Sequence, residues 1–150
     1  GEAMATPIIR ALGKQARTRG WDSQGLVVVD APPGSACPVI EALSEADVAL
    51  LVTEPTPFGL HDLKIAVQVA RDVLQRPVAI VINKSGDKDD AVEAFCDAEH
   101  LPVLLRIPLE RRIAEAYSSG QPLVSAFPAY RALFRGLLAR LADMASGGAS

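Results

Sequence analysis

The sequence predicts an α/β fold in which a parallel β-sheet is flanked by helices. Two observations support this fold class: short runs rich in Val, Ile and Leu recur along the chain, and helical patterns separate them. The runs are continuous rather than alternating, which is typical of parallel strands that are covered on both faces. The predicted strands are residues 25–29, 48–53, 78–82 and 103–107.

The predicted helices lie between and after these strands. Start and stop residues place helices at 7–19, 89–99 and 111–119, and apolar residues three and four positions apart indicate another helix from residue 60. The helix at 111–119 is expected to bury Ile113, Ala116 and Tyr117. The last helix, opened by Pro128, carries the strongest apolar stripe, formed by Tyr130, Leu133, Phe134, Leu137, Leu138 and Leu141. One domain is expected over residues 1–145, with a frayed tail at 146–150.

The composition excludes several function classes. A net charge of −3 and a pI near 5.3 give no electrostatic footprint for nucleic acid. No apolar run approaches the roughly 18 residues that a membrane-spanning helix needs, so no membrane association is expected. Cys37 and Cys96 show neither a disulfide pattern nor metal-ligand spacing, and His61 and His100 are interpreted as surface residues. A cytoplasmic protein fits these features best.

A carboxylate follows the first predicted strand. Asp30 ends the run Leu-Val-Val-Val, which places it at the carboxyl edge of the sheet, where open α/β sheets bind ligands. There it can hold Mg²⁺, which prefers one or two carboxylates and keeps several waters. The following Pro32, Pro33 and Gly34 are typical of a stiff loop whose glycine N–H can approach a phosphate. Alternatively, Asp30 only caps a short helix that begins near residue 35.

Three stretches together resemble one family. They are Asp-Ala-Pro-Pro-Gly-Ser-Ala-Cys-Pro from residue 30, Leu-Val-Thr-Glu-Pro-Thr-Pro-Phe-Gly-Leu-His-Asp-Leu from residue 51 and Val-Ile-Asn-Lys from residue 81. Their order resembles the MinD/ParA superfamily of P-loop NTPases, and more closely the MinD-like ATPases that carry an inserted ferredoxin domain. The resemblance extends to about residue 124 and covers the C-terminal half of such a nucleotide-binding domain. It implies ATP binding and hydrolysis coupled to dimerisation across the nucleotide.

The resemblance also implies roles for individual residues. Asp30 matches the family's magnesium-associated aspartate and is the one expected catalytic residue, and Gly34 matches the glycine of the switch loop. Asn83 matches the asparagine that meets the nucleotide base, and Pro108 matches the proline that lines the base pocket. The alternative for Asn83 is a turn residue that satisfies its own backbone. Thr53 and Glu54 fall near the expected phosphate loop, and no role is assigned to them.

Spacing argues against guanine. GTPases place an aspartate two positions after the lysine of their Asn-Lys pair, whereas this chain has Gly86 there and Asp87 one position late. Adenine is therefore the expected base, with Mg-ATP as the cofactor of the intact parent protein and ATP or ADP as its ligands.

The sequence departs from the family in one essential feature. It has no phosphate-binding loop, because its only Gly-Lys pair, Gly13-Lys14, is followed by Gln15 and lacks the first glycine of the motif. The isolated chain is thus expected neither to hydrolyse ATP nor to bind it tightly, since phosphoryl transfer depends on that charge neutralisation. The inserted ferredoxin's cysteines are absent too. Two alternatives remain: a non-catalytic protein-interaction module, or part of an amide-forming enzyme of the cobyrinic acid and dethiobiotin synthetase type.

The missing loop also predicts an incomplete sheet. In this superfamily the phosphate-loop strand lies between the strand that ends at the aspartate and the strand that follows it. Without it, the predicted strands at 25–29 and 48–53 should pair directly, or another copy of the chain should fill the gap as a homodimer or by a swapped segment.

Overall fold

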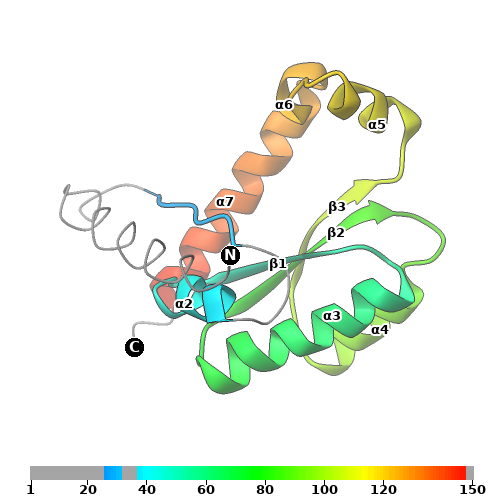
Figure 1. Ribbon diagram of the computed structural model, residues 1–150. Helices are drawn as coiled ribbons and strands as arrows, with labels where there is room; N and C mark the ends of the chain where they lie inside the picture. The colour runs from blue at the N-terminus through cyan, green and yellow to red at the C-terminus, as the bar shows by residue number, and fades with distance from the viewer. Residues whose placement is uncertain (1–25, 32–36, 148–150) are drawn as a thin grey trace.

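A computed structural model describes residues 26–31 and 37–147 of the chain. Figure 1 shows a small sheet with helices on both faces and an arm of helices at one end. The strands are β1 (Ala49–Thr53), β2 (Val78–Ser85) and β3 (Val103–Pro108). The helices are α2 (Cys37–Ser44), α3 (Pro57–Val67), the π-helix η1 (Gln68–Val73), α4 (Asp90–Ala98), α5 (Arg111–Ser118), α6 (Leu123–Ala126) and α7 (Ala129–Gly147).

The sheet is parallel, with strand order β1-β2-β3 among the described residues. The β1–β2 pairing runs from Ala49 opposite Val78 to Thr53 opposite Ile82. The first five residues of β2 are all buried, whereas β1 is covered only in part. The continuous apolar run at 78–82 therefore forms the central strand that its pattern predicts. The expected strands at 48–53, 78–82 and 103–107 are confirmed, with β2 three residues longer than predicted.

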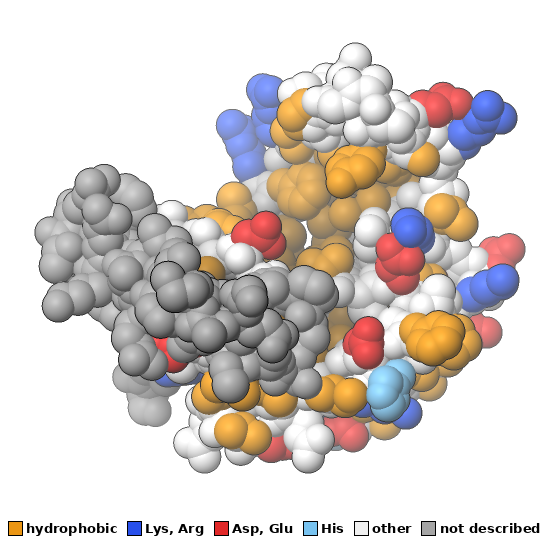
Figure 2. Space-filling view, in the orientation of Figure 1, with side chains coloured by type: hydrophobic (Ala, Val, Ile, Leu, Met, Phe, Trp, Pro, Cys, Tyr) orange, Lys and Arg blue, Asp and Glu red, His pale blue; other side chains and the backbone are white. Residues whose placement is uncertain are grey.

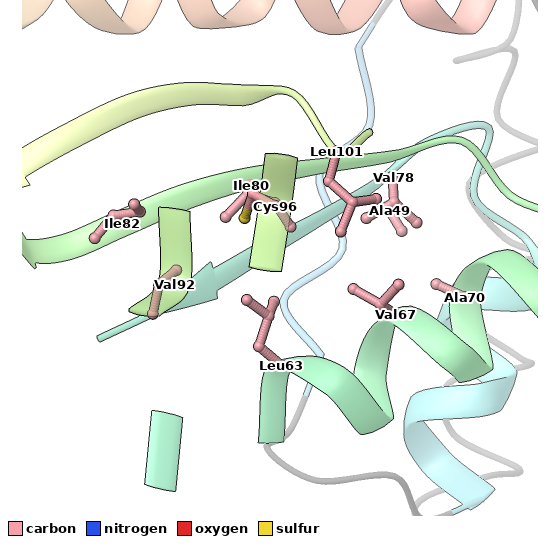
Figure 3. Packing of buried hydrophobic residues seen from close by; sticks show 10 residues of the cluster. All are labelled: Ala49, Leu63, Val67, Ala70, Val78, Ile80, Ile82, Val92, Cys96 and Leu101. Carbon is pink, nitrogen blue, oxygen red and sulfur yellow. The ribbon is translucent and has the colours of Figure 1, made fainter. Parts of the chain in front are cut away.

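Two hydrophobic cores lie on opposite faces of the sheet. One face packs against α3, η1 and α4, and Figure 3 shows its side chains between the sheet and these helices. Ala70, Ile80, Ile82 and Cys96 in this core are fully buried. The other face packs against α7, where Leu137 meets Val81 and Leu105. A sheet between two helical layers is the architecture that the sequence predicts.

The prediction of a buried strand at 25–29 is wrong for the residues that the structure describes. Residues 26–30 belong to no strand, and the side chains of Leu26, Val27, Val28 and Val29 are between 47% and 78% exposed. Direct pairing with β1 is also contradicted, because β1 pairs only with β2 in the described part of the chain. A strand needs a neighbour for its backbone hydrogen bonds, and the sequence lacks the phosphate-loop strand beside which this segment was expected to lie.

Several helical details also differ from the predictions. The helix expected from residue 60 begins at Pro57, where Thr56 caps it, and it continues as a π-helix. Tyr117 is 83% exposed rather than buried, since the short α5 projects in the arm and meets no sheet. On α7, Leu133 and Leu138 are 48% and 40% exposed, so the packed stripe is narrower than the sequence pattern indicates.

Some predictions fall on residues outside the described ranges. The helix at 7–19 and Gly34 of the predicted switch loop both lie there. The side chain of Cys37 is likewise not described. At the other end, α7 continues to Gly147, past the predicted boundary at residue 145.

Candidate functional site

The carboxyl ends of the three strands meet at one edge of the sheet. Asn83 on β2 lies opposite Ile107 on β3, and Ser85 lies opposite Pro108. The structure thus brings two sequence-predicted residues, Asn83 and Pro108, onto adjacent strands at the edge where parallel sheets bind ligands.

The Asn83 side chain lies at the carboxyl end of β2. It is half-buried at the end of β2, and its amide makes no hydrogen bond within the described part of the chain. A turn asparagine would instead bond its own backbone. A half-buried amide that offers both a donor and an acceptor can bind the edge of a purine, as amide side chains do with adenine N6 and N7.

The strand register skips one residue at this edge. The β2–β3 pairing shifts between Asn83 and Ser85, and Lys84 between them has a left-handed backbone with φ of 54°. Such irregularities redirect side chains and occur often beside functional sites. The Lys84 ammonium forms an ion pair with Glu54 at 2.8 Å, which joins the ends of β2 and β1. Both side chains are about half exposed, so the pair contributes little to stability.

The turn after β1 is closely packed. The Thr53 hydroxyl is buried and donates to the Gly59 carbonyl at 3.0 Å, while the Thr56 side chain caps α3 by accepting from Gly59 N at 3.0 Å. A Cβ at Gly59 would lie 2.2 Å from the Glu54 carbonyl oxygen, so only glycine fits there. No role was predicted for Thr53. The start of α3 could have been predicted from Thr56 followed by Pro57, because proline is favoured at the first position of a helix.

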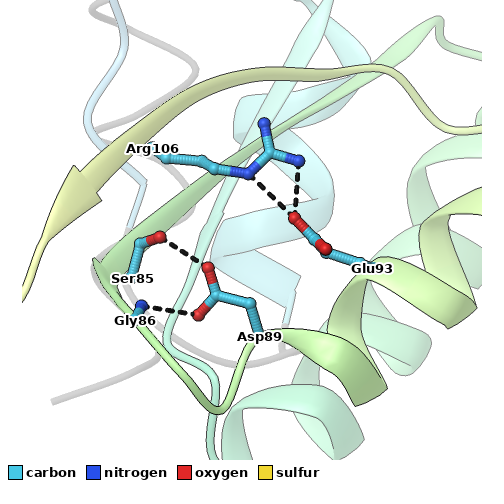
Figure 4. Close-up of polar contacts among 5 residues, drawn as sticks. All are labelled: Ser85, Gly86, Asp89, Glu93 and Arg106. Atoms are coloured by element: carbon cyan, nitrogen blue, oxygen red, sulfur yellow. Dashed lines mark hydrogen bonds and ion pairs between the residues drawn. The ribbon is translucent and has the colours of Figure 1, made fainter.

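The turn after β2 is held by a buried carboxylate, as Figure 4 shows. Asp89 accepts hydrogen bonds from the Ser85 hydroxyl at 2.5 Å and from Gly86 N at 2.9 Å, and it is 7% exposed. Both oxygens are therefore engaged inside the turn. Asp87 is exposed on the turn surface. Asp89 cannot take the place of the GTPase aspartate, which agrees with the spacing argument at Gly86.

An ion pair supports the same region from the helix behind it. The Arg106 guanidinium on β3 donates through Nε at 2.9 Å and Nη2 at 2.6 Å to one carboxylate oxygen of Glu93 on α4. This contact ties β3 to α4 close to the turn that carries Asp89.

The predicted metal-side residues are not joined to this edge. Asp30 is exposed, lies in no strand, and has no hydrogen bond or ion pair within the described residues. Gly34 lies outside those residues. Among residues 26–31 and 37–147, no group of three or more His, Cys, Asp or Glu side chains could hold a metal ion. A lone carboxylate is compatible with Mg²⁺, which keeps most of its ligands as water.

Other candidate groups have ordinary explanations. His61 and His100 are exposed, as predicted, and Cys96 is buried in the core. Burial is the main cause that raises the pKa of the Cys96 thiol.

No helix in the described ranges combines the length and apolar character needed to cross a bilayer. Figure 2 shows apolar side chains gathered in the hollow between the arm of α5, α6 and α7 and the rest of the molecule.

Comparison with known proteins agrees with this architecture. No protein-family model matches the chain. An uncharacterised protein of Methanocaldococcus jannaschii, MJ0579, is 37% identical over 94 residues, which is 63% of this chain and 31% of that protein. An iron–sulfur cluster carrier protein of Aquifex aeolicus is 27% identical over 135 residues, or 81% of this chain and 37% of that protein. The chain thus spans about a third of the length of these relatives.

Two solved structures share the fold. The MinD cell division protein of Aquifex aeolicus superposes with a TM-score of 0.70 at 21% identity, covering 89% of this chain and 61% of that one. The cell division ATPase MinD of Pyrococcus furiosus gives 0.63 at 28% identity, covering 80% and 51%. Three observations indicate the same class of protein. They are the motifs at residues 30, 51 and 81, the parallel sheet between two helical layers, and the similarity to these proteins. The chain has the fold of the MinD/ParA-type P-loop ATPases, and its sequence is similar to those of iron–sulfur cluster carrier proteins.

Proposed function

We propose that the chain supplies the base side and the magnesium side of an ATP site in a larger MinD-like ATPase. The observation that carries the proposal is the juxtaposition of Asn83 and Pro108 at the carboxyl edge, with the Asn83 amide free of partners in the described residues. Asn83 would bind the adenine edge, and Pro108 would cover the ring. Gly86, at the position where GTPases carry their base-reading aspartate, supports adenine over guanine.

Asp30 would take the magnesium side. Its exposed carboxylate has no cationic partner in the described part of the chain, so it is free to accept hydrogen bonds from metal-bound water. Gly34 would follow it in a loop that responds to the terminal phosphate. When bound, Mg²⁺ neutralises phosphate charge; the residues of this chain would orient the ion and the base. The phosphate-binding loop itself would come from other polypeptide, because the sequence has none.

The relation to iron–sulfur carriers suggests where such an ATPase would act. One relative is named an iron–sulfur cluster carrier and another a cytosolic Fe–S cluster assembly factor. We infer that the intact parent couples nucleotide binding to the handling of a cluster. Cys96 cannot contribute a ligand without unfolding, because it lies fully buried in the core.

Self-association follows from the exposed edge of the sheet. Val52 on β1 is 63% exposed, and Leu26 to Val29 form an apolar run without a strand partner in the described residues. Unpaired apolar edges recruit other strands. In the isolated chain we expect a second copy to cover this edge, whereas in the parent the phosphate-loop strand would occupy it.

Calorimetric titration of Mg-ATP tests the proposal. The 150-residue chain should bind weakly, and a longer polypeptide that adds an upstream phosphate loop should bind far more tightly, because that loop supplies the lysine and backbone N–H groups. Replacing Asn83 with Ala in the longer polypeptide should weaken binding about tenfold, as the loss of a good base contact does. Tight binding to the short chain, or no effect of Asn83→Ala, would refute the assignment.

A further inference from the structure

Asp89 occupies the position just before α4, where a carboxylate ordinarily caps the helix. Its side chain makes no such capping bond. Its backbone carbonyl accepts from Val92 N and Glu93 N, both at 2.9 Å, and so begins the helix without help from the side chain. The carboxylate instead points back to the turn after β2, toward Ser85 and Gly86. It therefore holds the turn rather than the helix.

Ser85 connects this carboxylate to the candidate base pocket. Its hydroxyl donates to Asp89, while its backbone carbonyl accepts from Leu109 N at 3.0 Å. The same residue pairs with Pro108 across the sheet. A chain of contacts thus runs from Asp89 through Ser85 to the end of β3, where the pocket-lining proline lies.

The backbone before Ser85 depends on these contacts. Lys84 has φ of 54°, a region that residues other than glycine rarely occupy and keep only when their surroundings impose it. The hydrogen bonds to Ser85 and Gly86 fix the chain immediately after Lys84. Asn83 lies directly before it, so the direction of the Asn83 amide depends on whether this turn is held.

We propose that Asp89 is a positioning residue for base recognition: it fixes the turn that aims the Asn83 amide and seats Pro108. The inference rests on the proposed function, since it assigns Asp89 to the same base pocket. It requires no contact between Asp89 and the ligand, which its engagement with Ser85 and Gly86 excludes.

The test compares nucleosides that differ where Asn83 would read the base. Adenosine and inosine are titrated into the ¹⁵N-labelled 150-residue chain, and the side-chain NH₂ signals of Asn83 are followed by NMR. The chain without substitutions should bind adenosine more tightly than inosine, because an amide oxygen accepts from the 6-amino group that inosine lacks. Asp89→Ala should weaken adenosine binding about tenfold and abolish the discrimination, since the turn loses both hydrogen bonds.

Matched variants separate positioning from general destabilisation. Asp90→Ala removes the same group one residue later, at an exposed site, and should change neither affinity nor discrimination. Asp89→Asn should retain both the affinity for adenosine and the discrimination against inosine, because the asparagine oxygen can accept from Gly86 N while its NH₂ donates to the Ser85 hydroxyl. If Asp89→Ala does not fold, Ser85→Ala removes one of the two bonds and should give a smaller loss of the same kind.

The outcomes distinguish this inference from the function on which it rests. If the chain without substitutions shows no saturable binding of adenosine, the assignment of the base pocket is refuted, and the inference is refuted with it. If this chain and Asp89→Ala discriminate equally well between adenosine and inosine, only the role of Asp89 is overturned. Equal losses in Asp89→Ala and Asp90→Ala would also overturn it.

Discussion

Replacing Gly59 with alanine should destabilise the protein, although alanine ordinarily favours helices. Gly59 lies in the first turn of α3, where alanine is better than glycine by about 0.5–1 kcal/mol. The added Cβ would meet the Glu54 carbonyl oxygen at 2.2 Å and the Thr53 hydroxyl at 3.1 Å. The first contact is with backbone, so it cannot be relieved by rotating a side chain.

The magnitude follows from these opposing terms. Relieving a backbone clash of about 1 Å typically costs about 1–3 kcal/mol, and the helix preference offsets less than 1 kcal/mol of it. For a chain of this size each kcal/mol lowers the melting temperature by about 2–4 °C. We therefore expect Gly59→Ala to melt several degrees below the natural sequence. The displaced Glu54 carbonyl would also disturb the Lys84–Glu54 ion pair at the carboxyl edge.

Gly136→Ala is the matched control. Gly136 lies within α7 and is exposed, and a Cβ there would meet nothing within 4 Å. The same substitution should therefore raise stability by about 0.5–1 kcal/mol. Thermal and urea unfolding followed by circular dichroism would measure both variants. The reasoning fails if Gly59→Ala is as stable as the natural sequence, or if the two variants shift in the same direction.

Two further predictions concern the sheet edge and the core. Val52→Lys should reduce self-association in sedimentation equilibrium, because a charge on an edge strand opposes pairing. Val73→Lys is the control and should not reduce it, since Val73 lies outside the sheet and is 66% exposed, against 63% for Val52. A natural chain that is monomeric at high concentration would contradict the proposed pairing. Burial raises the pKa of the Cys96 thiol, so the folded state retains its proton more strongly than the unfolded state and loses stability as the pH rises above about 8.5. Urea unfolding at pH 7 and pH 9.5 should therefore show a larger loss for the natural chain than for Cys96→Ala, and equal losses would exclude this linkage.

The sequence pattern predicted the central features of the fold for a physical reason. A run such as 78–82 is apolar at every position, and only a strand covered on both faces buries all five side chains, as β2 does. The placement of Asn83 and Pro108 on neighbouring strands at one edge followed from the same logic, because parallel strands end together. The turn residues Asp89 and Ser85 escaped prediction, since a carboxylate before a helix is ordinarily interpreted as its cap.

The sequence by itself determined whether most segments form a strand or a helix, and it determined the motifs at the strand ends. Both depend on local spacing and residue type. Tertiary structure decided which apolar segments found a partner. Leu26 to Val29 have the composition of a strand yet stay exposed, whereas Ile80 with the same character is fully buried. Strand formation requires backbone hydrogen bonds and side-chain cover from neighbours. A segment's own residues cannot specify whether those neighbours are present.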